Sequence, residues 1–490
     1  MMRRPFKIAP WFALCVFLWA PPSRGQATDW KQITPGPLHP FHPQMPKRIQ
    51  LDNGMVIFLQ EDHELPLIRG ITQIRGGSRD EPADKVGLVQ IYGQSWRTGG
   101  TKTRTGDQLD DHLEALAAKV ETGGGTDFVT VSWDCLKENF DDVFKVYREL
   151  LSDPEFRPDK IAIAKTQLNT TISRRNDSPF QIAFREASKL VYGADSPYAR
   201  VSEYATIAAV SREDLLDWHR RYVHPNNVLL GVVGDFDSKV MESKLRQAFD
   251  SWPKGPAAAK AQLAFHGPKP GVYFVEKNDV TASTIQMVDL GTTRDNPDYY
   301  AIEVFNQFFG GSSSSRLFSN IRSKKGLAYA VSGAIGTDYD RPGVLRLFMS
   351  TKSGTTAAAI DAFNEELDAL KSNPATPEEL TKAKDAILNS FVFRFDSKEK
   401  VLREQMTYAF FGYPSDFLDR YRTGIEKVTQ ADVARAAQKY IHKNQLAILV
   451  VGKAADFDRP LSSFGPVTAL NIVIPAPPAA KKEAGTGAAQ

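Results

Sequence analysis

The chain has 490 residues, of which 42% are hydrophobic and 24% are charged, and it contains only two cysteines. This composition is typical of a folded globular chain and excludes both an intrinsically disordered chain and a small disulfide-stapled domain. The formal net charge is +3, and removing the four basic residues of residues 1–27, a stretch without acids, leaves −1. A nearly neutral chain without a basic run argues against nucleic acid as a partner.

Residues 1–27 have the pattern of a secretory signal peptide. Basic residues come first, a short apolar run follows from Ile8 to Ala20, and small residues precede the expected cleavage after Gly25 or Ala27. The alternative is an uncleaved anchor in the membrane interface. The run is shorter than the roughly 20 residues that span a bilayer, and no later segment is long and apolar enough, so we expect no transmembrane helix. The leader predicts secretion across the inner membrane and a periplasmic location.

Two further segments are not expected to belong to the folded part. Residues 28–47 form a proline-rich arm, in which each proline restricts its own backbone and that of the residue before it. Residues 474–490 are rich in Pro, Ala, Lys and Gly and have too little apolar content to order themselves, so a disordered tail is expected.

The sequence between these segments contains an internal repeat. Residues 210–234 reappear as residues 428–452 at a constant offset, and both copies contain Tyr-x-His followed by an apolar run that ends at glycine. In each copy the pattern predicts a helix, N-capped by Ser211 or Thr429, and then a buried strand.

The opening strands of the two copies also correspond, since residues 56–59 match residues 272–275. The chain is therefore interpreted as two tandem homologous modules, residues 48–252 and 272–473, joined by a linker at residues 253–271. Each module has the size of an ordinary domain.

Long helical patterns follow the opening strands in both modules. They are expected at residues 107–120 and 136–151 in the first module and at residues 357–372 and 377–391 in the second. Helices grouped against mostly antiparallel strands indicate an α+β fold in which the two modules enclose a cleft. Clefts between domains commonly bind ligands.

Several short segments of the first module occur in a specific order. They are Leu51-Asp52-Asn53-Gly54, Gly76-Gly77-Ser78-Arg79-Asp80-Glu81, Gly87-Leu88, and Tyr222 and Asn226 before Val233-Gly234. Together with the two-module layout, these segments resemble the M16 zinc peptidases of the pitrilysin or insulinase type, specifically the short branch that includes processing peptidases. The resemblance covers approximately residues 48–455 and implies the same α+β fold.

The zinc-binding motif of that family is replaced in this sequence. Family members carry His-x-x-Glu-His on a helix after the Gly-Leu pair, where two histidines bind Zn²⁺ and the glutamate activates the metal-bound water. The matching positions are Gln90, Gly93 and Gln94, and the third ligand, a glutamate in the family, would fall near Thr170 or Thr171. The resemblance therefore predicts no metal site and no peptide hydrolysis by this chain alone. Gly93 is interpreted as tolerance of a weaker helix.

The second module contains a segment that closely matches the sequence signature of this module in the family. Residues 309–332 predict a serine-capped helix that ends at Gly326 and turns into a strand of alternating pattern, with Arg322 in the last helical turn and Tyr329 early on the strand. In the family, the matching Arg and Tyr hold the substrate backbone and stabilise the oxyanion, roles that suit a permanent cation and a phenol donor. The alternative is that Arg322 compensates the helix end while Tyr329 packs in the core.

A glycine-rich stretch lies at residues 118–130, where family members present an edge strand to the substrate. Gly123, Gly124, Gly125 and Thr126 are the candidate substrate-binding residues, because such an edge can add a peptide strand by main-chain hydrogen bonds. The alternative interpretation of the stretch is a flexible turn.

The resemblance predicts a noncatalytic, zinc-less subunit of a heterodimeric M16-like metallopeptidase. Arg322 and Tyr329 would act in trans on a peptide substrate, and a partner subunit with His-x-x-Glu-His would supply the zinc, so no cofactor is expected in this chain. The main alternative is a structural or peptide-binding scaffold protein without a peptidase role. A third interpretation is an independent hydrolase with unconventional metal ligands, which stoichiometric zinc in the isolated chain would support.

Overall fold

The computed structural model describes residues 43–259 and 263–478. The predicted signal peptide, the arm before Pro43 and the tail after Pro478 lie outside the described residues. Within the described ranges, no helix is both long and apolar enough to cross a membrane. The described beginning of the predicted tail has tertiary contacts, because Ile474 packs against the hydrophobic core of the first module.

The first sheet has six strands in the order β1-β2-β6-β3-β5-β4. All neighbours are antiparallel except β2 and β6, which are parallel. The central β6 is buried along its whole length, whereas β5 alternates between buried and half-buried residues. The strands are β1 (Lys47–Gln50), β2 (Val56–Glu61), β3 (Leu67–Arg75), β4 (Lys119–Gly124), β5 (Phe128–Leu136) and β6 (Val228–Gly234).

The second sheet repeats this design with the order β10-β12-β8-β13-β7-β14. The pairs β13–β7 and β14–β7 are parallel and the others are antiparallel. A separate short parallel pair joins β9 to β11. The strands are β7 (Gly271–Glu276), β8 (Ala282–Leu290), β9 (Thr292–Thr293), β10 (Ala330–Ala334), β11 (Thr337–Asp338), β12 (Val344–Lys352), β13 (Ala447–Gly452) and β14 (Val467–Ala469).

Helices pack on both sheets, so the predicted α+β class with two mostly antiparallel sheets is confirmed. The helices of the first module are α1 (Leu88–Thr98), α2 (Gly106–Ala115), α3 (Phe140–Ser152), α4 (Pro158–Arg174), α5 (Pro179–Tyr192), α6 (Tyr204–Ala209), α7 (Arg212–Tyr222) and α8 (Ser238–Phe249). Those of the second are α9 (Tyr299–Phe309), a π-helix (Phe318–Lys324), α10 (Thr356–Ser372), α11 (Pro377–Phe391), α12 (Lys398–Phe411), α13 (Phe417–Lys427) and α14 (Gln430–Tyr440).

The helix predicted at residues 107–120 is too long. The helix α2 ends at Ala115, and Ala117 adopts a φ of 48°, a left-handed conformation that an α-helix cannot contain. The chain then enters β4 at Lys119. The apolar periodicity did not reveal this break because alanine is the best helix former and gives no stop signal.

The repeated helix–strand unit is confirmed. The hydroxyls of Ser211 and Thr429 accept hydrogen bonds from the backbone N–H groups of Asp214 and Asp432, which forms matching capping boxes at α7 and α14. Each helix is followed by a buried strand that ends at a glycine, β6 in the first module and β13 in the second.

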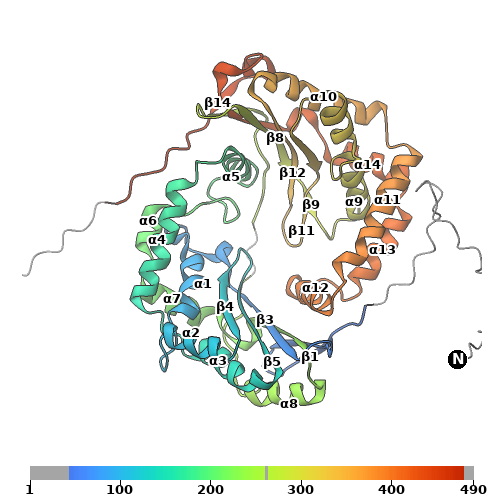
Figure 1. Cartoon of the computed structure of the whole chain (residues 1–490). Coiled ribbons are helices and arrows are strands. Elements are labelled where there is room, and N and C mark those ends of the chain that lie inside the picture. Colours follow the sequence, from blue (N-terminus) through green and yellow to red (C-terminus); the bar gives the residue numbers. More distant parts are fainter. Residues whose placement is uncertain (1–42, 260–262, 479–490) are drawn as a thin grey trace, which may run out of the picture. The chain divides into compact units, whose positions relative to one another are not determined.

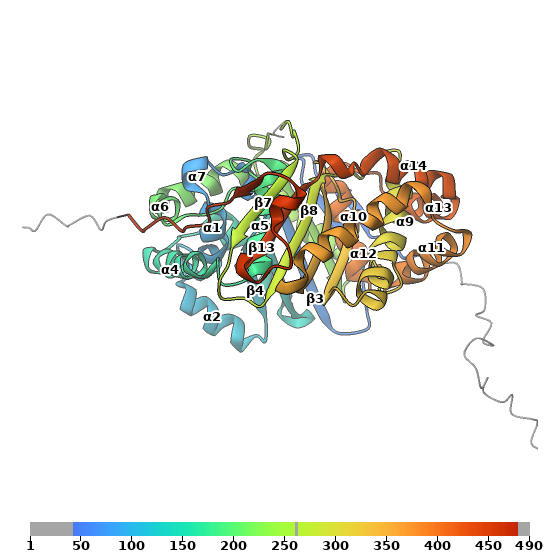
Figure 2. The same ribbon diagram turned by 90° about the horizontal axis from the view of Figure 1, so that it is seen from above.

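Each module contributes one helix to the sheet of the other (Figure 1). The helix α5 packs on the second sheet, where Ile182 and Val191 lie in one buried cluster with Val288. In the view from above, α5 overlaps strands β7, β8 and β13 (Figure 2). The helix α12 packs on the first sheet, where Met406 lies in one buried cluster with Phe58. One face of each sheet is therefore partly covered by the other module.

Candidate functional site

Helix α1 carries the positions that match the zinc motif. Gln90 and Gln94 are exposed one turn apart on this helix, whereas Gly93 is buried. The buried carboxylate of Glu81 accepts hydrogen bonds from the first N–H groups of the helix, those of Gly87 at 3.1 Å and Val89 at 2.6 Å. Burial raises the pKa of Glu81 above its usual range, and these two bonds oppose the rise. Glu81 therefore fixes the start of the helix.

Gly93 is required by a close contact between α1 and β4. A Cβ atom at this position would lie 2.3 Å from the backbone nitrogen of Gly124 and 2.6 Å from the carbonyl carbon of Gly123. The Thr122 hydroxyl donates to the Gly93 carbonyl at 2.7 Å, and a Cβ atom at Gly124 would lie 2.2 Å from the Val89 carbonyl oxygen. The interpretation of Gly93 as mere tolerance is therefore wrong. The main chain of β4 fills the space that a glutamate side chain would need.

The position of the third ligand lies on α4, which packs against α1. Thr170 and Thr171 are exposed, and their hydroxyls donate back to carbonyls of their own helix at 3.0 and 3.1 Å. Across residues 43–259 and 263–478, no three His, Cys, Asp or Glu side chains gather closely enough to bind a metal ion. Two glutamines and two threonines are poor zinc ligands, so these four side chains do not fit a zinc centre.

A small polar hollow of about 220 Å³ lies beside Gln90. Its lining residues are Ser78, Glu81, Val86, Gly87, Gln90, Pro197, Arg200, Val201 and Ser202. The Arg200 guanidinium donates to the backbone carbonyls of Ser78 and Glu81, which holds the signature loop in place.

The glycine-rich hairpin forms the outer edge of the first sheet, as the family resemblance implies. Gly123 and Gly124 pack against α1. The carbonyl of Gly125 accepts from the Ser78 N–H at 2.9 Å, and that of Thr126 accepts from the Arg79 N–H at 3.1 Å. These two carbonyls are already hydrogen-bonded within the chain, and the substrate role of the four residues stays a prediction.

Arg322 lies in the last turn of the π-helix of the second module. This helix begins where the Ser315 hydroxyl accepts from the Phe318 N–H at 3.4 Å. Arg322 is exposed, and its guanidinium carbon stands 4.7 Å from the centre of the Phe318 ring. Among the residues that the structure describes, no carboxylate pairs with Arg322 and no carbonyl accepts from it. The cation is therefore available for a further ligand.

Tyr329 directly precedes β10, after the turn at Gly326 with its φ of 65°. Its backbone N–H donates to the Ser350 carbonyl at 2.8 Å, which anchors the residue to the sheet. The side chain is 57% exposed, so the alternative that Tyr329 packs in the core is wrong. Arg322 and Tyr329 thus lie at the two ends of one short connection, both accessible.

A largely buried ion cluster joins the signature loop of the first module to the second module. Arg79 pairs with Asp127 at 2.9 Å and, across the modules, with Asp340 at 2.6 Å. Arg341 pairs with Asp127 at 3.2 Å. Burial lowers the pKa of Arg79, but the bond and charge of Asp340 together with Tyr198 and Asp127 outweigh it, so the pKa lies above its ordinary value. The loop that borders the Gln90 hollow is therefore held by both modules.

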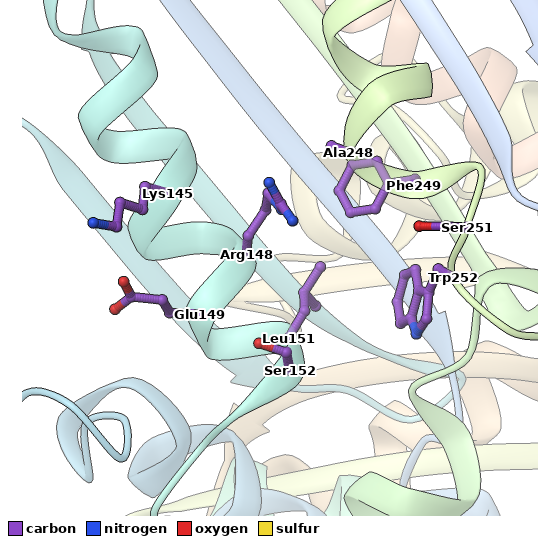
Figure 3. A pocket seen from close by; sticks show the side chains of 9 residues that line it. All are labelled: Lys145, Arg148, Glu149, Leu151, Ser152, Ala248, Phe249, Ser251 and Trp252. Carbon is purple, nitrogen blue, oxygen red and sulfur yellow. The ribbon is translucent and has the colours of Figure 1, made fainter.

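A larger hollow, of about 440 Å³, lies away from these residues, between α3 and the end of α8 (Figure 3). It contains none of the predicted site residues. Its lining residues are Lys145, Arg148, Glu149, Leu151, Ser152, Ala248, Phe249, Ser251 and Trp252.

Comparisons with known proteins agree with this architecture. Residues 209–387 match the family model described as the peptidase M16 inactive domain. The chain is 24% identical over 358 residues to the Bacillus subtilis protein named uncharacterized zinc protease YmxG, covering 72% of this chain and 85% of that protein. It is 22% identical over 404 residues to the Helicobacter pylori protein named non-peptidase homolog YmxG, covering 81% of this chain and 91% of that protein.

A solved structure shows the same fold. The peptidase M16 inactive domain from Pseudomonas fluorescens superposes with a TM-score of 0.74 at 24% identity, covering 83% of this chain and 98% of that chain. This solved structure shares the fold of the chain, in which the positions that the resemblance matches to the zinc motif are Gln90, Gly93 and Gln94. The chain is similar to proteins of the M16 peptidase family, and these relatives include proteins named as non-peptidase or inactive.

Proposed function

We propose that this chain is the noncatalytic subunit of a heterodimeric M16-like metallopeptidase. In this proposal a partner subunit with His-x-x-Glu-His holds the zinc, which activates water for attack on the peptide. This chain contributes Arg322 and Tyr329, whose cation and phenol O–H face the negative charge that develops on the carbonyl oxygen. Its leader directs it to the periplasm.

The contrast between the two modules carries the proposal. The main chain of β4 closes the space at Gly93, so the first module has lost the room for a catalytic glutamate as well as the metal ligands. In the second module Arg322 and Tyr329 remain exposed, and among the described residues no carboxylate pairs with Arg322, whose guanidinium stands over the Phe318 ring. An exposed cation and an exposed phenol at the two ends of one short connection are the groups that suit a developing negative charge.

The first experiment is affinity purification of the tagged full chain from its native envelope fraction, followed by mass spectrometry. A stoichiometric partner that carries His-x-x-Glu-His supports the proposal. Purification of the chain alone, or with copies of itself only, argues against a heterodimer.

The second experiment tests the two side chains in the purified complex. Arg322→Ala or Tyr329→Phe is expected to lower kcat by a factor on the order of 10²–10³ without dissociating the complex, as for the loss of one oxyanion donor. Lys324→Ala is the matched control, because Lys324 is an exposed cation on the same helical turn. Unchanged turnover in both variants would refute the assigned role.

The second candidate function is a structural or peptide-binding scaffold without a peptidase role. The similarity to a protein named non-peptidase homolog favours it, as does the engagement of the Gly125 and Thr126 carbonyls within the chain. Assembly with a partner that is preserved while both Arg322→Ala and Tyr329→Phe are silent would support this candidate.

A further inference from the structure

Part of the second sheet is left uncovered by α5. On β8, Val288 faces α5 and lies in one buried cluster with residues of that helix. Arg346 of β12 pairs directly with Val288, so Arg346 and, two residues on, Phe348 lie on the same face of the sheet. On the neighbouring β10, Ala334 and Ser332 pair with these two residues and are exposed. Small side chains on β10 therefore leave the Arg346 and Phe348 side chains open on one flank.

Among the described residues, no carboxylate forms an ion pair with the guanidinium of Arg346. Its carbon lies 3.9 Å from the centre of the Phe184 ring of α5. No carboxylate lies within ion-pair distance in the described part of the chain, and the facing titratable group is the phenol of Tyr192, also on α5. Burial lowers the pKa of Arg346 to about 10. The charged guanidinium is therefore partly removed from water, and no ion pair in the described part of the chain offsets that cost.

Two more aromatic side chains, Phe180 and Phe348, extend the surface around the Phe184 ring. The rings of Phe180 and Phe184 are 4.2 Å apart at their centres, and the Phe180 ring meets Phe348 edge-on at 5.4 Å. Phe180 is 49% exposed although it is a large apolar residue. We call Phe180, Phe184, Arg346 and Phe348 the Arg346 patch. It joins an unpaired cation to an exposed aromatic surface, which are complementary to a carboxylate and an apolar side chain.

The corresponding face of the first sheet also carries an arginine beside a phenylalanine of the crossing helix, because the Arg75 guanidinium lies 4.4 Å from the centre of the Phe410 ring of α12 and donates to the Phe410 carbonyl at 2.7 Å. There Arg69 pairs with Asp134 at 3.0 Å and with Glu399 of α12 at 3.5 Å, so its charge is compensated within the chain. Arg346 differs from these two arginines of the first sheet, because within the described residues its guanidinium contacts the Phe184 ring without the ion pair of Arg69 or the carbonyl acceptor of Arg75.

The main chain at the end of β10 is already hydrogen-bonded within the chain. The Gly333 N–H donates to the Gly310 carbonyl at 3.4 Å, and Asn306 bonds both the N–H and the carbonyl of Ile335. At this end of the strand, recognition of a ligand therefore falls to the side chains of the patch.

We propose that the Arg346 patch binds a peptide that carries a carboxylate beside aromatic side chains. The planar guanidinium of Arg346 takes the carboxylate through two parallel hydrogen bonds, and Phe180 and Phe348 contact the neighbouring aromatic side chains. This inference deepens the proposed function, on which it rests, because it names the class of peptide that the subunit selects.

The test uses isothermal titration calorimetry on the isolated full chain. Three heptapeptides share an acetylated N-terminus: an amidated one with central Phe-Glu-Phe, an amidated one with Phe-Gln-Phe, and one that ends in Phe-Gln-Phe with a free carboxylate. At least tenfold tighter binding of a carboxylate peptide than of the neutral one is expected. The amidated and free-ended arms distinguish an acidic side chain from a chain terminus as the source of the carboxylate.

Arg346→Gln is expected to abolish that tenfold preference and leave the affinity for the neutral peptide unchanged. Arg420→Gln, at an exposed arginine of α13, is the control for net charge and should keep the preference. A preference that survives Arg346→Gln, or no binding of any peptide, would overturn the inference. Because no partner is present, failure here is distinguishable from failure of the heterodimer, which the purification experiment reports.

Discussion

His219 lies in the core of the first module with both ring nitrogens hydrogen-bonded. Its Nε2 lies 2.9 Å from the Leu151 carbonyl, which can only accept, so Nε2 carries the proton. Its Nδ1, 2.9 Å from the Tyr92 hydroxyl, then accepts. Both bonds suit the neutral ring, and burial lowers the pKa of His219 to about 4.

The free energy of unfolding is therefore expected to fall as the pH is lowered from 6.5 to 4. In this range His219 is protonated in the unfolded chain but neutral in the folded chain. This difference lowers the free energy of unfolding by up to about 3 kcal/mol in total. The measurement is urea denaturation across this pH range. His219→Gln, which retains a donor and an acceptor but does not titrate, should flatten the decline.

The exposed His63 provides the control. Hydrogen bonds to Asp235 and Glu61 raise its pKa, so its stabilising contribution is present at low pH and is lost as the pH rises. His63→Gln should therefore not flatten the decline on the acid side. An equal decline in wild type and His219→Gln would show that other groups cause it.

Residue-scale expectations from the sequence held where the cause is local. The caps at Ser211 and Thr429 depend on a side chain and a backbone N–H three residues away, so the sequence pattern was sufficient. The state of His219 depends on Tyr92 and Leu151, which are distant in sequence, and nothing in the sequence pattern marked it.

The contact between α1 and β4 shows what a sequence pattern omits at the scale of elements. Gly93, Gly123 and Gly124 were assessed as separate signals, a weak helix and an edge strand, but they form one close approach. The coincidence of a mid-helix glycine with a later glycine run was the available signal. Only the pairing of elements in space shows why both need glycine.

Gly93→Ala is expected to destabilise the chain by about 2 kcal/mol, although alanine in a helix interior ordinarily gains about 1 kcal/mol over glycine. The added Cβ would meet the backbone of β4, which cannot move aside as a side chain can. Urea denaturation of Gly93→Ala beside Gln94→Ala, an exposed position on the same helix, checks this. A stabilised Gly93→Ala variant would contradict the contact.

At the scale of the whole molecule, the repeat predicted two sheets but not how they are joined. The helices α5 and α12 occupy corresponding places in the two modules, and each contacts the sheet of the other. The apolar face of a helix shows that it must be covered but not by which sheet, so this exchange could not be read from periodicity. The Arg79–Asp340 pair adds a charged contact between the modules.

The exchange predicts that the modules do not fold independently. Fragments 43–259 and 263–478 should each be poorly soluble or melt without cooperativity when expressed alone, because α5 or α12 then loses the sheet it covers. Co-expression should give a soluble pair that melts cooperatively in calorimetry. Independent cooperative melting of either fragment at the temperature of the full chain would contradict the exchange as a source of stability.

A matched pair of variants locates the effect on α12. Met406 is fully buried against the first sheet, and Arg403 is exposed on the same helix. Met406→Asp would place a charge in that apolar contact at a cost of several kcal/mol, so it should prevent the co-expressed fragments from associating. Arg403→Asp should not. Met and Arg have similar helix propensities, so both substitutions by Asp should weaken α12 itself to the same extent. A difference in fragment association between the two variants therefore reports the contact of α12 with the first sheet.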